Sequence, residues 1–393
     1  MVQGDLAVEN GATILAENAV VTVEGIVETQ GNVVFDCTLK AGELHGSDGD
    51  VEVRGDLMIE DDLDVSDGSL HVAGSLTARD VDVDRELEVL KDATVGDIDV
   101  GGRIHVDGKL KAASVDVGGT LEVSDAVEAE DVNAGGVVKL LKQVRCRKID
   151  VGGTVVIGGG TVTEKIDVGG SFESTGPLQF DEIDVGGRVR LRGDSSGKRI
   201  DVGGSVNVDG SLNFEELDVG GTIEIHGDSQ GKSMDVGGIL TVKGNLNLAG
   251  QLDIGGKCKI GGILEAHQVD VGGVIEANEI KSHEVEVGGS IATVKGVRAD
   301  SIEIGERGRV RGPLIGLDSV VIGERSEVEE IHGKNIRLEE RSRASSVYGE
   351  NIRIESRCRI LGEVLYTGKL DAEEDVEFAS QPRKVDSLPD VPS

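Results

Sequence analysis

The stretch Ile200–Ile225, "IDVGGSVNVDGSLNFEELDVGGTIEI", contains nearly the same pattern twice. Asp201 and Asp218 open two identical Asp-Val-Gly-Gly units, and the interval between them defines a 17-residue period. Within one period, three short segments alternate apolar and polar residues, and a small or polar corner follows each segment. Alternation with a period of two predicts strands, and the spacing typical of helices is absent. Three strands per period predict one coil of a triangular β-helix.

The acidic residue of this unit recurs along most of the chain at a nearly constant step of one period. Its positions are Asp64, Asp82, Asp99, Asp116, Asp150, Asp167, Asp184, Asp201, Asp218, Asp235, Asp253, Asp270, Glu286 and Glu303. Asn133 marks a degenerate copy between Asp116 and Asp150, and the phase continues at Val321, Arg337 and Arg353. A coil of this size cannot bury its apolar face alone, whereas stacked coils pair every strand above and below. The predicted fold class is therefore all-β, a single-stranded triangular parallel β-helix (solenoid) built on the 17-residue coil.

The repeat also predicts which side chains point inward and why two glycines follow the Asp-Val pair. In the quoted stretch the inward residues are Ile200, Val202, Val206, Val208, Leu212 and Phe214, and the outward ones are Asp201, Asn207 and Asn213. A corner after so short a strand must bend sharply, and glycine alone enters positive φ without penalty. We therefore interpret Gly-Gly as a corner. A phosphate-binding loop is disfavoured because no helix follows any copy.

Regularity along the chain suggests four segments. We expect irregular N-terminal β-coils over residues 1–63, a regular β-helix of 16–18-residue repeats over 64–360, and a terminal coil over 361–380. Residues 381–393 are rich in proline and are expected to form a disordered tail.

Composition narrows the function classes. The formal net charge is −34, which argues against nucleic-acid binding because a phosphate-binding surface needs clustered Lys and Arg. The four cysteines lie far apart in the sequence, which favours reduced, buried thiols over disulfides or a zinc site. No signal peptide or apolar run of membrane-spanning length is evident. We therefore expect a cytoplasmic protein.

Residues typical of catalysis or cofactor binding show no organised pattern. The seven histidines share no phase within the repeat, and "HGDSQGKS" at 226–233 has the wrong spacing for a nucleotide-binding loop. We therefore predict no enzyme activity, no catalytic or metal site, and no cofactor. The recurring Asp forms a column of carboxylates, which we interpret as a solvated face that keeps the protein soluble. A ladder of bound divalent cations is the alternative.

The two ends of the β-helix are the candidate functional sites. A β-helix end exposes unpaired strand edges and an apolar cross-section unless a polar repeat or a helix caps it. Neither terminal region shows such a cap. The candidate polymerisation residues are Leu6, Val8, Ile14, Leu365, Tyr366, Leu370 and Phe378.

Short glycine-cornered β-coils, uncapped ends and a proline-containing tail resemble the bactofilins, the polymer-forming cytoskeletal proteins of bacteria and archaea. The resemblance covers residues 1–380 and rests on pattern and coil length. It implies a right-handed β-helix whose copies join at their ends, without nucleotide, into non-polar filaments that act as scaffolds. This chain is longer than the compact core of familiar bacterial members, which suggests an archaeal-type member. It lacks the apolar N-terminal segment through which many bactofilins reach membranes, so direct membrane binding is not expected.

Two hypotheses of different class follow. The first is a cytoskeletal scaffold that forms a homopolymer through its terminal coils. The second is a monomeric acidic β-solenoid that acts as a binding scaffold for a basic partner or for cations.

Overall fold

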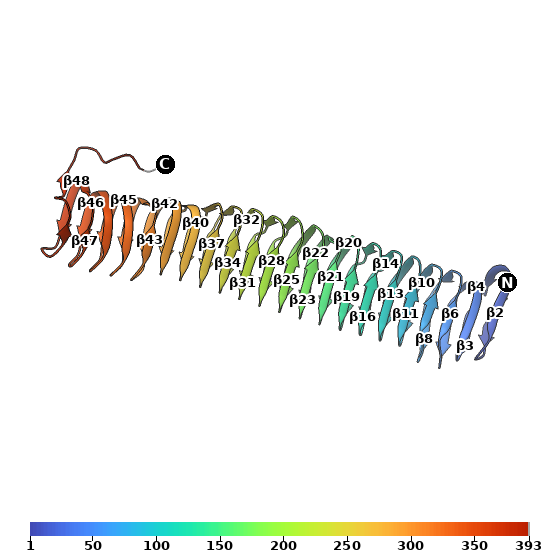
Figure 1. The fold of residues 1–393 in the computed structure, drawn as a ribbon. Helices are drawn as coiled ribbons and strands as arrows, with labels where there is room; N and C mark the ends of the chain where they lie inside the picture. Colours follow the sequence, from blue (N-terminus) through green and yellow to red (C-terminus); the bar gives the residue numbers. More distant parts are fainter. Residues whose placement is uncertain (392–393) are drawn as a thin grey trace. The chain divides into compact units, whose positions relative to one another are not determined.

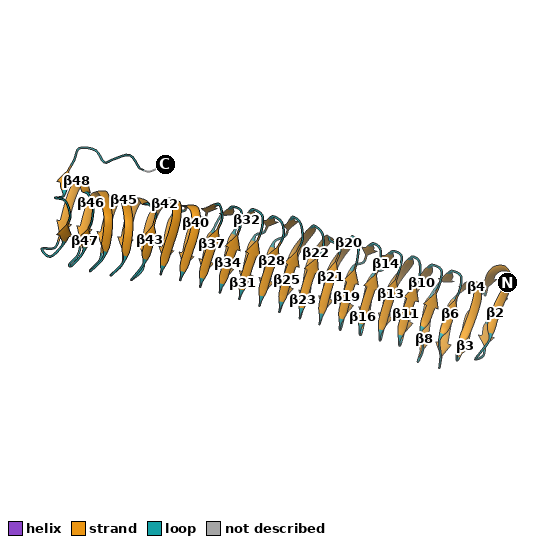
Figure 2. Ribbon diagram, in the orientation of Figure 1, coloured by secondary structure: helices purple, strands orange, loops and turns teal. Residues whose placement is uncertain are grey.

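The computed structural model describes residues 1–391, which contain strands and turns but no helix (Figures 1 and 2). Contacts between residues divide the chain into two compact units, Met1–Gly197 and the part that begins at Lys198. Each unit is a β-solenoid built from parallel strands. The predicted all-β fold class is confirmed.

The first unit contains strands β1 to β26. Their bounds are β1 (Leu6–Val8), β2 (Thr13–Thr22), β3 (Ile26–Gln30), β4 (Val33–Ala41), β5 (Glu43–Ser47), β6 (Val51–Val53), β7 (Leu57–Ile59), β8 (Asp62–Ser66), β9 (Leu70–Val72), β10 (Leu76–Val83), β11 (Glu86–Val89), β12 (Ala93–Val100), β13 (Arg103–Val106), β14 (Leu110–Lys111), β15 (Ser114–Val117), β16 (Thr120–Val123), β17 (Val127–Glu128), β18 (Asp131–Ala134), β19 (Val137–Leu140), β20 (Val144–Val151), β21 (Thr154–Ile157), β22 (Gly160–Val168), β23 (Ser171–Ser174), β24 (Leu178–Val185), β25 (Arg188–Leu191) and β26 (Ser195–Ser196).

The second unit contains strands β27 to β50. Their bounds are β27 (Arg199–Val202), β28 (Ser205–Val208), β29 (Leu212–Asn213), β30 (Glu216–Val219), β31 (Thr222–Ile225), β32 (Ser229–Gly231), β33 (Ser233–Val236), β34 (Ile239–Val242), β35 (Leu246–Leu248), β36 (Gln251–Ile254), β37 (Lys257–Ile260), β38 (Ile263–Glu265), β39 (Gln268–Val271), β40 (Val274–Lys281), β41 (Glu284–Val287), β42 (Ser290–Ile304), β43 (Arg309–Arg311), β44 (Leu314–Ile322), β45 (Glu327–Leu338), β46 (Arg343–Ile354), β47 (Arg359–Ile360), β48 (Val364–Ala372), β49 (Glu377–Phe378) and β50 (Arg383–Lys384).

From β27 to β38 each coil contributes one separate strand to each of three faces, whereas elsewhere a longer strand such as β42 continues from one face to the next. In the second unit β27 pairs with β30, β28 with β31 and β29 with β32, all in parallel. The register places Asp201 beside Asp218, as the repeat requires. The six side chains predicted to point inward, Ile200, Val202, Val206, Val208, Leu212 and Phe214, are all buried. The three predicted outward residues are exposed or half-buried, so the predicted alternation is confirmed.

The first coils are less regular because their lengths vary. Leu6 pairs with Val27, Val27 with Leu44 and Leu44 with Leu63, so three successive coils differ in the number of residues they contain. One corner of these coils is held by a ladder of side-chain acceptors, in which Asn10 Oδ1 accepts from the Asn32 amide at 3.0 Å and Asn32 Oδ1 from the Asp50 amide at 2.9 Å. A polar side chain in one coil thus satisfies the backbone of the next, which explains why Asn and Asp recur there.

The Gly-Gly corners exist for a different reason from the predicted one. Gly118 and Gly119 do not adopt positive φ. Instead the corners stack backbone on backbone: a Cβ at Gly118 would lie 2.1 Å from the carbonyl oxygen of Gly101, and one at Gly119 would lie 2.4 Å from that of Gly102. The prediction of a left-handed corner is therefore wrong. Glycine is required because the neighbouring coil leaves no room for a side chain.

The C-terminal region contains one more strand than expected. Of the predicted tail at 381–393, the structure describes 381–391, and it places Arg383 and Lys384 in β50, paired with Leu365 and Tyr366 of β48. The short strand forms because the backbone edge of β48 offers partners even to a polar segment. Residues 392–393 lie outside the described residues.

The four cysteines are buried and unpaired, as their spacing predicted. Burial raises the pKa of the Cys146 and Cys258 thiols to about 12, so both stay protonated at neutral pH. Such thiols behave as small apolar side chains of the core.

Candidate functional site

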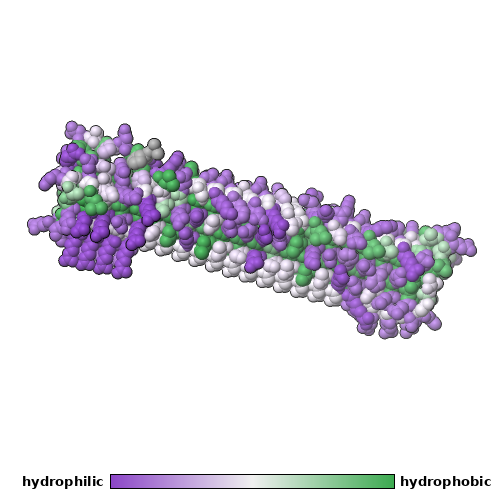
Figure 3. Space-filling view, in the orientation of Figure 1, coloured by the Kyte–Doolittle hydropathy of each residue, from purple (hydrophilic) through white to green (hydrophobic). Residues whose placement is uncertain are grey.

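At the N-terminal end, the first coil is open on one side. Strands β1 and β2 pair only with β3 and β4, so their other edges have no partner within the described chain. Leu6 pairs with Val27 and Ile14 with Phe35; Val27 and Phe35 are completely buried, whereas Leu6 and Ile14 are half-buried. In Figure 3, hydrophobic surface lies among hydrophilic surface around this end, which is the blue end of Figure 1.

The predicted N-terminal residues do not all lie on this open side. Val8, the third of them, is 6 % exposed and belongs to the core of the first coil. Leu15, which the sequence did not single out, is 72 % exposed on β2. Leu15 breaks the alternation of β2 as an apolar residue at an outward position, which is the signal that could have identified it.

The C-terminal end has the same construction on two of its strand segments. Leu370 pairs with Ile352 and Phe378 pairs with Ile360. Ile352 and Ile360 are 2 % and 1 % exposed, whereas Leu370 and Phe378 are half-buried. Strand β49 pairs only with β47, so its outer edge is unpaired within the described residues.

The third segment of this end is covered by the chain itself. Strand β50 lies along Leu365 and Tyr366, and the Val385 amide donates to the Tyr366 carbonyl oxygen at 2.9 Å. Leu365 is 7 % exposed and Tyr366 is half-buried. Of the seven predicted residues, Leu6, Ile14, Leu370 and Phe378 therefore lie at open strand edges, whereas Val8 and Leu365 are buried and Tyr366 lies beneath β50.

The Asp column forms on one face in each unit, as the repeat predicted. In the first unit Lys165 bridges two of its members, with Nζ at 2.9 Å from carboxylate oxygens of both Asp167 and Asp184. Where no cation intervenes, the carboxylates disfavour one another's charge. Burial and the neighbouring Asp64 and Asp99 raise the pKa of Asp82.

Part of this column in the first unit lines a groove of about 580 Å³. The carboxylates that line it are Asp62, Asp64, Asp80, Asp82, Asp97, Asp99 and Asp116, with His45 at the edge. No group of three or more His, Cys, Asp or Glu residues in the described chain is arranged to hold a metal ion. The groove is an acidic surface.

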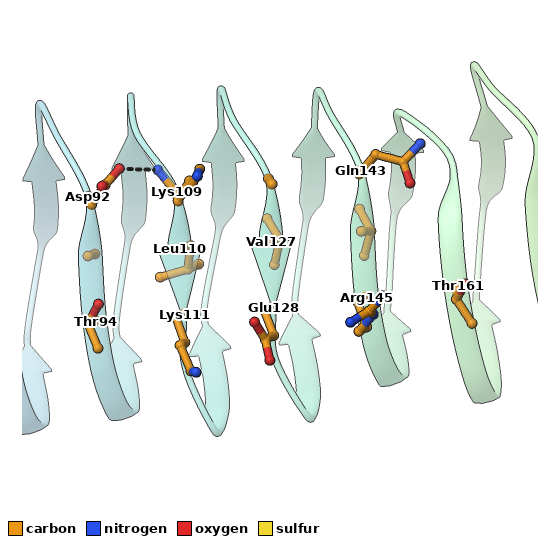
Figure 4. Close-up of a pocket in the computed structure, with 13 residues that line it drawn as sticks. Asp92, Thr94, Lys109, Leu110, Lys111, Val127, Glu128, Gln143, Arg145 and Thr161 are labelled. Carbon is orange, nitrogen blue, oxygen red and sulfur yellow. Dashed lines mark hydrogen bonds between the residues drawn. The ribbon is translucent and has the colours of Figure 1, made fainter.

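A second groove, of about 450 Å³, lies on another face of the first unit (Figure 4). Lys111, Glu128 and Arg145 follow one another on adjacent strands across it, so their charges alternate. At its edge Asp92 Oδ1 accepts a hydrogen bond from the Lys109 amide at 2.8 Å. Side chains of alternating charge along a surface groove suit a polar contact, and the lining contains no nucleophile paired with a base.

Two histidines that the sequence treated as scattered lie together in the second unit. The rings of His267 and His283 are 4.7 Å apart, and His283 Nδ1 lies 2.7 Å from an Asp300 carboxylate oxygen. These residues occupy one corner in three consecutive coils. His267, His283 and Asp300 are each about one period apart in the sequence, and this spacing could have shown that they lie side by side.

Comparisons with protein-family models, with curated proteins and with solved structures found no match. Within residues 1–391, no helix is long and apolar enough to cross a membrane.

Proposed function

We propose that the protein is a cytoskeletal scaffold whose copies join at their terminal coils, without nucleotide, into non-polar filaments. The observation that carries the proposal is the state of four apolar side chains. Leu6, Ile14, Leu370 and Phe378 are half-buried, whereas the residues paired with them one coil inward are fully or almost fully buried. A further strand layer from another copy would complete the burial of each.

Unpaired strand edges supply the second half of the contact. The outer edges of β1, β2 and β49 offer backbone N–H and C=O groups, and an edge of this kind is a template for pairing with another chain. Apolar burial gives the affinity and the backbone ladder gives the register, so one contact uses both features of a solenoid end.

The experiment is negative-stain electron microscopy of the purified protein without nucleotide, with sedimentation of the same samples. Filaments are expected for the wild type. Ile14→Arg and Phe378→Arg each place a charge on one end, whereas Val294→Arg changes a side chain that is 79 % exposed on the flank of β42 and is the matched control.

The two end variants also separate the two kinds of filament. In a non-polar filament, like ends meet, so each end variant removes one type of junction and leaves dimers joined through the other. In a head-to-tail filament every junction uses both ends, so either variant leaves monomers. Filaments that survive both substitutions would contradict the proposal.

Charge should affect one junction more than the other. Residues 1–100 contain 24 Asp and Glu against 5 Lys and Arg, a net charge of −19. Two such ends repel each other, and salt screens that repulsion, so junctions between N-terminal ends should strengthen as salt increases. Sedimentation of the Phe378→Arg dimer at rising salt tests this, and a dimer fraction that does not change would count against N-terminal pairing.

The acidic groove favours a second candidate function, a monomeric scaffold for a basic partner or cations. Its seven carboxylates lie on a flank and not at an end. Under this alternative, the protein stays monomeric at all salt concentrations, and Ile14→Arg and Phe378→Arg leave binding of a polylysine probe unchanged.

A further inference from the structure

One face of the second unit changes its charge along the solenoid. The outward residues that follow one another there, strand by strand, are Asp270, Glu286, Glu303, Val321, Arg337 and Arg353, which we call the charge stripe. The charge is negative before Val321 and positive after it. A pattern that reverses its sign about one apolar residue is complementary to itself when turned end over end.

We propose that the charge stripe is a lateral docking surface for a second, antiparallel copy of this chain, related by a two-fold axis through Val321. Val321 then faces Val321 of the second copy, Arg337 faces its Glu303, and Arg353 faces its Glu286. Each contact occurs twice, as a closed isologous pair requires.

Four of the five charges of the stripe are not neutralised within one chain. Among the described residues, Glu286, Glu303 and Arg353 make no ion pair, whereas Arg337 holds Glu355 at 2.8 Å. The charge of Asp270, and then burial, raises the pKa of Glu286, which shows that like charges crowd this part of the stripe. An arginine from a second copy would relieve that crowding.

The neighbouring row of side chains fits the same arrangement. Ser319, Asn335 and Asn351 run beside the stripe, and a shallow groove of about 310 Å³, with Ile336 and Ile352 at its floor, separates the two rows. Asn351 Nδ2 donates to Asn335 Oδ1 at 3.1 Å, which leaves the amide ladder with further donors. In the paired arrangement Asn335 faces Ser301 and Asn351 faces Glu284, both able to accept.

Other registers of the two copies are worse. Moving the axis by one coil to Glu303 would place Glu303 against Glu303 of the second copy, and Val321 against Glu286 of the second copy. The pairing about Val321 ends at the next coil, where Asp371 would face Asp270 and Lys369 stands beside Asp371. The surface is thus limited to the five coils that carry Glu286, Glu303, Val321, Arg337 and Arg353.

The size of this surface predicts a weak contact. Five coils at a spacing of ~4.8 Å and strands of about four residues give on the order of 300 Å² per copy. Stable interfaces bury about 800 Å² per partner. The pair should therefore form at high protein concentration and low salt, and should be disrupted by salt because it depends on exposed charges.

A cysteine at the axis provides the test. Val321→Cys should form a disulfide-linked dimer on mild oxidation, because a two-fold axis brings the same residue of both copies together. The four native cysteines are buried, so the wild type is the background control. Asp218→Cys, on the same face among acidic residues, is the matched control and should cross-link at least several-fold less.

Charge reversal then tests whether the stripe itself is recognised. In the Val321→Cys chain, Glu286→Arg alone and Arg353→Glu alone should each reduce cross-linking several-fold, and the two together should restore it. Glu286→Arg removes a crowded carboxylate, so the loss cannot be ascribed to a weakened fold. Equal cross-linking of Val321→Cys and Asp218→Cys, or no restoration in the combined variant, would overturn the proposal.

This inference does not require end-to-end assembly. Cross-linking of Val321→Cys that persists in the Phe378→Arg background shows that lateral pairing does not need the C-terminal junction, and cross-linking of Val321→Cys with both ends intact but without filaments supports lateral pairing and counts against the filament. Filaments without cross-linking at Val321 support end-to-end assembly and count against lateral pairing.

Discussion

Two regions of the second unit build the same corner in different ways. From Gly203–Gly204 to Gly288–Gly289 the corner is Gly-Gly, and a Cβ at Gly221 would lie 2.2 Å from the Gly204 carbonyl oxygen. In the last coils the corner residues are Arg307, Arg325, Arg341 and Arg357, with φ of 57° to 61°. The first corner stacks backbones too closely for any side chain. The second bends at one left-handed residue whose side chain points to solvent.

A buried small residue follows each arginine of these corners and stabilises the corner. Gly308, Ser326, Ser342 and Cys358 follow the four arginines, and all are buried. Ser326 Oγ accepts from the Gly308 amide at 2.9 Å and lies 3.0 Å from the Gly305 carbonyl oxygen, to which it donates. The side chain of one coil thus satisfies backbone groups of the coil before it, which a Gly-Gly corner cannot do. Two local solutions therefore preserve one coil spacing.

The largest expected difference between the two corners is their tolerance of a methyl group. Gly221→Ala should lower the free energy of unfolding by on the order of 1–3 kcal/mol, because a carbonyl oxygen of the adjacent coil occupies the space of the new Cβ. Arg341→Gly should leave it unchanged or raise it by up to about 1 kcal/mol, because glycine accepts positive φ without strain. Urea denaturation of both variants, followed by circular dichroism, measures the difference.

Equal loss in the two variants would contradict this account of the corners. Arg341→Ala gives a further check, because alanine keeps the Cβ at positive φ while removing the charge. It should resemble the wild type, since arginine already carries the same strain.

The next effect in size concerns the hydroxyl ladder of the arginine corners. Ser342→Ala removes an Oγ that donates to the Gly323 carbonyl oxygen at 2.9 Å and leaves that buried oxygen without this donor. A loss of about 1–3 kcal/mol in the free energy of unfolding is expected. Ser345→Ala, at a nearby exposed position, is the matched control and should have no measurable effect. Comparable loss in both would show that the ladder contributes nothing specific.

The sequence predicted the fold because period and alternation act together. A repeat of alternating Val and Asp with a constant period can bury its apolar face only by stacking in register, so the inward set around Ile200 followed directly. The purpose of Gly-Gly did not follow, because the obstacle at Gly221 is the backbone of another coil. A sequence shows the small residue but not what lies against it.

The candidate site was predictable only in part, for a related reason. Alternation identified Leu6, Ile14, Leu370 and Phe378 as inward residues of terminal coils, but it could not show that β50 would cover Leu365 and Tyr366. Strand pairing by a polar segment such as Arg383–Lys384 depends on a free backbone edge and not on side-chain pattern. The charge stripe required the register that places Val321 between Glu303 and Arg337.

The smallest expected effect is a pH dependence of stability, which distinguishes the acidic face from the arginine-bearing coils. Burial, and then the charges of Asp253 and Asp218, raise the pKa of Asp235 above its ordinary 3.8. The folded state therefore binds this proton more tightly than the unfolded chain does. The contribution of Asp235 to the free energy of unfolding therefore grows as pH falls from neutral through the raised pKa. It stops growing below 3.8, where Asp235 is protonated in both states.

Asp235→Asn should remove this dependence. The variant should have a higher urea midpoint than the wild type at neutral pH, because a repelling charge is gone, and the difference should shrink to zero below the ordinary Asp pKa. The comparison is made between variant and wild type at each pH, since other groups titrate in the opposite sense: the hydrogen bond from Lys257 lowers the pKa of Glu276, and its stabilisation is lost in acid. Glu306→Gln, in an exposed arginine corner, is the control. A variant that is less stable than the wild type at neutral pH would mean that Asp235 is held by an attractive contact, and that the column is not a row of mutually repelling charges.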